Sequence, residues 1–170
     1  MEQLARFHFQ TVHFPIALSF TALFLIVVGL LSKKEKFFIS GRIILYLATL
    51  GALVAMTTGL MAEEYLPHSH AGEIRAIMEW HETLGITIVV SLVVISLLAF
   101  LESRKPSQTI KTFISILLIV LVGAVGFTGY LGGRLGHEFG VGIKKEQPAQ
   151  QPIEQPVDKH EGHEHHDHSH

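Results

Sequence analysis

Four long stretches of the chain contain no Asp, Glu, Lys or Arg. They cover residues 7–32, 43–62, 83–101 and 112–133. Each reaches the roughly 20 residues that a helix needs to cross a hydrocarbon core of about 30 Å. Apolar side chains lie on all sides of these segments, and a helix without a polar face needs lipid or a large core around it. A chain of 170 residues cannot build four such cores, so the pattern predicts an all-α membrane protein, a bundle of four transmembrane helices.

The composition changes abruptly after Ile143. Residues 144–170 have no aromatic side chain, and Pro148, Pro152 and Pro156 recur at every fourth position. This composition predicts an extended, disordered segment. We therefore divide the chain into a transmembrane domain, residues 1–143, and a disordered, His-rich C-terminal tail. The tail holds three Lys against six Asp or Glu, so it accounts for the net charge of −2.

Basic residues near the predicted spans indicate an orientation. The connections at one end of the bundle carry seven of them: Lys33, Lys34, Lys36, Arg42, Arg104, Lys105 and Lys111. The other end has Arg6, Arg75 and Arg134, with Lys144 and Lys145 further out. Short loops rich in Lys and Arg stay in the cytoplasm. We therefore expect a bacterial inner (cytoplasmic) membrane protein that crosses the membrane four times and has both termini outside the cytoplasm.

The composition is unusual in two respects, because the chain has twelve histidines and no cysteine. The lack of cysteine excludes disulfides, thiolate metal sites and covalently attached haem. Six histidines interleave with acidic residues in the last eleven positions: His160, His163, His165, His166, His168 and His170. Imidazoles and carboxylates suit zinc, copper or nickel, so we expect the tail to bind one of these metals. A merely solubilising tail is the alternative.

The other six histidines lie at or beyond one end of the predicted bundle, the outward end: His8, His13, His68, His70, His81 and His137. His13 stands eighteen residues before Leu31, and His81 stands twenty before Leu101. A helical rise of 1.5 Å per residue therefore places both at about 27–30 Å from the cytoplasmic end. Helical phasing also puts His81 on an apolar stripe with Ile74, Ile77, Met78, Leu84, Gly85 and Ile88. We expect this helix to begin before the membrane as an amphipathic segment, with His81 facing inward.

Small residues form stripes on two of the predicted helices. The second span has Ala48, Gly51, Ala52, Ala55, Gly59 and Ala62, and the fourth has Gly126, Gly129, Gly133 and Gly136 with His137 at the edge. Such stripes let helix backbones approach closely. Close packing is the favoured interpretation, and a face for a flat cofactor is the alternative.

Four segments occur in a characteristic order: VHFPIALSF, GLMAEEYLP, EWHETLG and GGRLGHEFGVGI. With them the chain resembles a bacterial family of small four-helix membrane proteins, the domain of unknown function 2231. The resemblance covers about residues 8–143. It singles out eight positions: His13, Pro15, Gly59, His81, Gly132, Gly133, Gly140 and Gly142. It implies the four-helix membrane architecture and assigns no activity to these residues.

Three functions remain open. The first is a b-type cytochrome, an electron carrier near the outer face that links quinol to a periplasmic acceptor. Its haem b would be held by His13 and His81, with His137 or Met78 as substitutes. The second is a periplasm-facing metal-handling protein, in which the tail passes an ion to His13, His81 and His137, with Glu63 as a further ligand. The third is a non-catalytic subunit of a membrane complex.

Several other chemistries lack their motifs. The chain has no phosphate-binding loop, no nucleophile elbow and no HExxH sequence. A stand-alone enzyme is therefore less favoured than an electron carrier, a binding protein or a complex subunit. Basic residues flank the spans and form no groove, so we expect the lipid bilayer and not nucleic acid as a partner.

Overall fold

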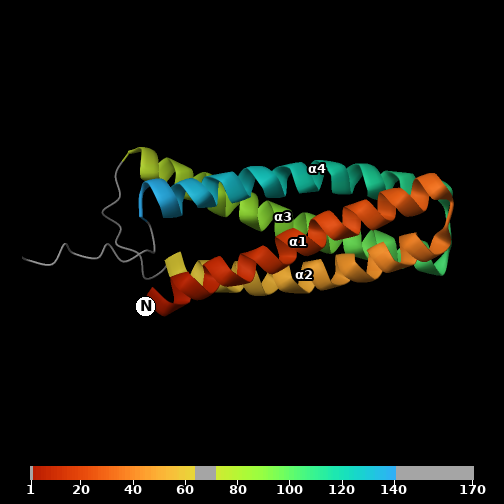
Figure 1. The fold of residues 1–170 in the computed structure, drawn as a ribbon, viewed down its shortest axis with the longest axis horizontal. Helices are drawn as coiled ribbons and strands as arrows, with labels where there is room; N and C mark the ends of the chain where they lie inside the picture. Colours follow the sequence, from red (N-terminus) through yellow and green to blue (C-terminus); the bar gives the residue numbers. More distant parts are fainter. Residues whose placement is uncertain (1, 64–71, 141–170) are drawn as a thin grey trace, which may run out of the picture.

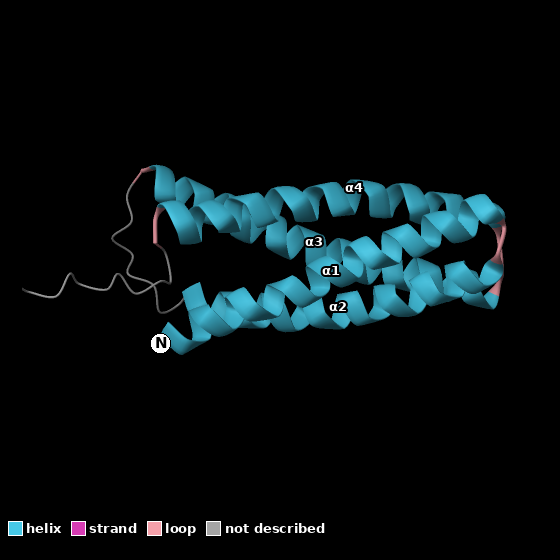
Figure 2. Cartoon of the chain, viewed as in Figure 1, coloured by secondary structure: helices cyan, strands magenta, loops and turns pink. Residues whose placement is uncertain are grey.

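The computed structural model describes residues 2–63 and 72–140. The helices are α1 (Glu2–Ser32), α2 (Glu35–Glu63), α3 (Glu73–Arg104) and α4 (Gln108–Gly133), and a π-helical turn, η1 (Arg134–Glu138), continues α4. Short loops at one end of the bundle join α1 to α2 and α3 to α4, so neighbours in sequence run antiparallel (Figure 1). The described residues form no strand (Figure 2). The predicted all-α, four-helix architecture is confirmed, and the predicted tail lies outside the described residues.

All four helices are long and apolar enough to cross a membrane. Their most apolar 18-residue windows have mean hydropathies of 2.0 to 2.8, yet only 28–33% of each window is buried. Large apolar side chains therefore point away from the bundle: Phe24 is 67% exposed and Val120 is 69% exposed. Water would destabilise such a surface, whereas lipid tails solvate it.

The helices extend beyond the charge-free stretches of the sequence. Helix α3 begins at Glu73, and along its first turns Ile77 is buried whereas Arg75 and Glu79 are exposed. The predicted amphipathic start of this helix is therefore confirmed. Placing Lys36, Arg42, Arg104 and Lys111 in the connections was wrong, because all four lie inside helices. The charges of Arg42 and Lys111 have partners there.

A single hydrophobic core joins the four helices over most of their length. In the described residues each helix contacts its two neighbours in the ring α1–α2–α3–α4, and diagonal pairs make no such contact. Ala22, Leu45, Leu92 and Leu118 contribute one buried side chain from each helix. Toward the end where the chain begins, the buried members of this core reach Ala52 in α2 and Val125 in α4. Beyond that level the α1–α2 and α3–α4 hairpins separate (Figure 1), and Ile77, Leu131 and Leu135 form a separate cluster.

The two small-residue stripes behave differently. On α2, Ala48 and Ala52 are 0% and 5% exposed, so close packing is confirmed there. On α4, a Cβ atom added at Gly126, Gly129 or Gly133 would meet nothing within 4 Å. Close packing was therefore the wrong interpretation for these three glycines within the described part of the chain, because no neighbouring helix approaches them closely.

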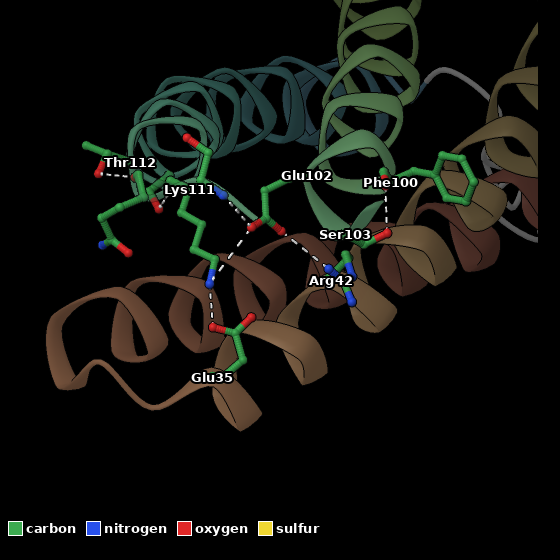
Figure 3. Close-up of polar contacts among 10 residues, drawn as sticks. Glu35, Arg42, Phe100, Glu102, Ser103, Lys111 and Thr112 are labelled. Carbon is green, nitrogen blue, oxygen red and sulfur yellow. Dashed lines mark hydrogen bonds and ion pairs between the residues drawn. The ribbon is translucent and has the colours of Figure 1, made fainter. Parts of the chain in front are cut away.

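The opposite end of the bundle holds a buried ionic network, which defines the charged end (Figure 3). Glu102 is only 1% exposed, and its Oε2 lies 3.4 Å from Nη1 of Arg42. Its Oε1 lies 3.8 Å from Nζ of Lys111, which also pairs with Glu35. The backbone N–H of Ser107 donates to Glu102 over 3.4 Å. The network thus ties α2 to α3 and α4, and it leaves no charge of Glu102 without a partner.

Replacing Glu102 by Gln tests this network. The substitution leaves Arg42 without its carboxylate, and breaking a buried pair costs about 3–5 kcal/mol. We expect a loss of that size in unfolding free energy, measured by denaturation in mixed detergent micelles. The matched control is Glu79→Gln on the same helix, since the Glu79–Arg75 pair is exposed and contributes little. Equal losses in the two variants would contradict a stabilising role for the buried network.

Candidate functional site

The histidine end is the end of the bundle that holds His8 on α1 and His81 on α3. His81 is half-buried, and its Nδ1 lies 3.1 Å from the backbone carbonyl oxygen of Thr128 on α4. A carbonyl oxygen only accepts hydrogen bonds, so Nδ1 carries the proton and donates it. The neutral ring then has a free electron pair on Nε2, the form in which histidine binds metals. The predicted inward orientation of His81 is confirmed.

His8 has the same kind of environment in the other hairpin. Its half-buried ring places Nδ1 3.0 Å from the carbonyl oxygen of Ala55 on α2 and 3.2 Å from Oγ1 of Thr58. The donor is again Nδ1, so Nε2 is again the free nitrogen. Sequence reasoning placed His8 in the outward layer but did not select it as a ligand. The small-residue stripe on α2, whose Gly59 lies against His8, was the signal that could have identified it.

A glycine lies against each imidazole. A Cβ atom at Gly59 would be 2.9 Å from Cε1 of His8, and one at Gly132 would be 3.0 Å from Cε1 of His81. Both distances are shorter than ordinary van der Waals contact. Any larger residue would therefore push the ring away from the carbonyl that orients it, and this explains why glycine stands at these two positions.

The other histidines selected from the sequence have different surroundings. His13 is exposed, and its Nδ1 donates to the carbonyl oxygen of Phe9 on its own helix over 2.6 Å. His137 is exposed on η1. No hydrogen bond within residues 2–63 and 72–140 joins His13, His81 and His137, so the matched depth of His13 and His81 is not accompanied by a contact. Glu63 is the last residue of α2, and its side chain lies outside the described part of the structure, as do His68, His70 and the six histidines of the tail.

Arg134 fixes the end of α4 beside this site. Its Nη2 donates to Glu73 at the start of α3 over 2.9 Å, and its Nε donates to Glu138 over 2.8 Å. Its guanidinium also lies 5.6 Å from the ring centre of Phe139. These contacts hold the π-helical turn against α3, the helix that carries His81.

Comparison with known proteins agrees with this architecture. The sequence model of a family described as "Predicted membrane protein (DUF2231)" matches residues 6–145. The chain therefore belongs to this family of membrane proteins, as the sequence motifs predicted. The match includes His8, His81 and both glycines that contact them. No curated protein and no solved structure matches the chain.

Substituting Gly132 by Ala tests the close approach of His81 to α4. The new methyl group must displace the imidazole, and overpacking of this kind costs about 1–3 kcal/mol. Gly126→Ala on the same helix is the matched control, because its methyl group meets nothing and alanine favours the helix. We expect Gly132→Ala to unfold at lower denaturant than Gly126→Ala in mixed micelles. Indistinguishable midpoints would show that the described contact between His81 and Gly132 is absent.

Proposed function

We propose that this membrane protein is a b-type cytochrome that carries electrons at the histidine end of the bundle. The observation that supports this most is the setting of His81. Its Nδ1 is held by the Thr128 carbonyl at 3.1 Å, which fixes the ring and leaves Nε2 as a ligand atom. An oriented, neutral imidazole of this kind is what haem iron binds. Haem would supply one-electron chemistry, since the chain itself offers no redox-active cysteine.

The donor set favours haem over a closed metal centre. A structural or catalytic zinc site needs three or four protein ligands, and no group of three or more His, Asp or Glu suited to a metal occurs among the described residues. Haem needs only two axial side chains, because the porphyrin supplies the other four nitrogens. Without cysteine, covalent attachment of the c type is impossible, so the haem would be of the b type.

The proposed orientation indicates which side of the membrane the redox site would face. Lys33 and Lys34 lie in the α1–α2 loop at the charged end, Lys36 lies in the first turn of α2, and Lys105 is in the α3–α4 loop. Basic loops favour the cytoplasm. The histidine end would then face the periplasm of a bacterial inner membrane. Quinol in the bilayer and a periplasmic redox protein are the partners that such a site would serve.

Absorption spectroscopy tests the haem directly. After expression with ample haem, we expect the detergent-purified protein to show a Soret band and a b-type pyridine haemochrome. His81→Ala should lose most of that absorption, whereas Glu79→Gln, an exposed change two positions away, should keep it. Purified wild-type protein without a Soret band would exclude the cytochrome.

The tail supports a second, separate proposal of metal capture. Histidines and acidic residues alternate between His160 and His170, and such ligands suit Zn²⁺, Cu²⁺ or Ni²⁺. This proposal does not depend on the haem.

Deleting residues 158–170 tests the tail. We expect the truncated protein to bind less Zn²⁺, Cu²⁺ or Ni²⁺ per chain in elemental analysis, while the helical content measured by circular dichroism stays that of the four-helix domain. An unchanged metal stoichiometry would refute metal capture by the tail.

A further inference from the structure

The two hairpins present His8 and His81 in the same way, and we propose that these two histidines are the axial pair of a single haem. This inference rests on the proposed cytochrome function and deepens it by naming the second ligand. It replaces the His13–His81 pair expected from the sequence. The resulting site is two-fold symmetric, with one ligand from each half of the chain.

The carbonyl and glycine contacts of the two imidazoles match, and His8 alone has a further contact, with Oγ1 of Thr58 at 3.2 Å. In each hairpin Nδ1 donates to a carbonyl 47 residues later, at 3.0 Å for His8 and 3.1 Å for His81. One helical turn beyond that carbonyl, a glycine lies against Cε1 of the ring in both cases. The three residues of the α3–α4 hairpin lie 73 positions after their counterparts in the α1–α2 hairpin: His8 and His81, Ala55 and Thr128, Gly59 and Gly132.

The same spacing relates the cores of the two hairpins. Buried positions pair off across 73 residues along both helices: Ala22 and Ile95, Leu45 and Leu118, Ala48 and Leu121, Ala52 and Val125. Most of these pairs differ in residue type, so the repeat is visible in burial and contacts more than in sequence. Because α1 and α3 run in the same direction, the axis that relates the halves follows the bundle, as in membrane proteins built from parallel repeats.

This symmetry directs both histidines toward one site. Their helices, α1 and α3, are diagonal in the bundle and do not contact each other within the described residues. The shared hydrophobic core ends at Ala52 and Val125, three residues before the two accepting carbonyls. His8 and His81 would hold the haem at the level directly beyond that core, where it would supply one-electron chemistry.

His13 does not fit this arrangement. It lies five residues after His8, which places it about 140° further round α1. Its ring is exposed, whereas that of His8 is half-buried against α2. Nδ1 of His13 donates to a carbonyl of its own helix, so no second helix orients it. It is therefore the natural control, an imidazole on the same helix with a free Nε2 but on another face.

The repeat gives no second pair of matched ligands at the charged end among the described residues. At the charged end the counterparts across 73 residues are Gly29 and Glu102, and Phe38 and Lys111. Neither pair offers two equivalent ligands. Gly29 packs against Phe38 in the first hairpin, whereas Glu102 forms an ion pair with Lys111 in the second.

Spectra of ligand variants test the assignment. We expect the ferric wild type to show a low-spin, six-coordinate spectrum. His8→Gln keeps an N–H donor for the Ala55 carbonyl but removes the imidazole, so we expect loss of the low-spin spectrum and its return when free imidazole is added. His8→Met should stay low-spin with a raised reduction potential, since a Met/His pair raises it. His13→Gln should match the wild type.

The outcomes separate the two proposals. A wild-type protein that takes up no haem would overturn the cytochrome function and this assignment with it. A haem-loaded wild type whose low-spin spectrum survives His8→Gln, or is lost in His13→Gln, would overturn the assignment of His8 alone. Rescue of His8→Gln by free imidazole would show that the fold persists and only the ligand is missing.

Discussion

Hydrocarbon offers no water to a polar group, so each N–H, O–H and charged atom in a membrane span needs a partner within the protein. The described residues follow this constraint throughout, and none of their buried polar side-chain atoms lacks a hydrogen bond. Hydroxyl groups such as those of Ser19 and Thr49 donate to carbonyls one turn earlier. His8 and His81 obey the same rule by donating from Nδ1 to a neighbouring helix. The hydrogen bond that pairs the imidazole N–H also fixes the orientation of the ring and leaves Nε2 available. The same contact therefore meets the requirement of the membrane and prepares a ligand atom.

The two ends of the bundle meet this constraint in different ways. At the charged end, Glu102 and its cationic partners join three helices, and the shared core packs directly above them. At the histidine end each hairpin satisfies its own imidazole internally, and the core is no longer shared. A bundle that is fixed at one end and divided at the other places one oriented imidazole in each hairpin. Preorganisation of this kind reduces the entropy lost when a ligand binds.

The sequence was sufficient for the fold, because charge-free stretches of about 20 residues have few alternatives to a membrane helix. It also predicted the apolar stripe that turns His81 inward. It failed for His8, since depth along a helix says nothing about which side faces the neighbour, and the first span is too uniformly apolar for phasing to separate His8 from His13. It also missed Glu102, whose partners come from α2 and α4. The 73-residue repeat was equally hidden, because its paired positions share burial and contacts but few residue types.

One haem between two imidazoles has a low-spin magnetic signature that a haem with one protein ligand, or with none, would not produce. The most direct measurement is the low-temperature electron paramagnetic resonance spectrum of the ferric wild-type protein in lipid nanodiscs, with haem and protein quantified on the same sample. We predict a single low-spin, bis-imidazole signal at one haem per chain. A high-spin signal, two low-spin species, or a protein that remains free of haem would contradict a symmetric site built from His8 and His81.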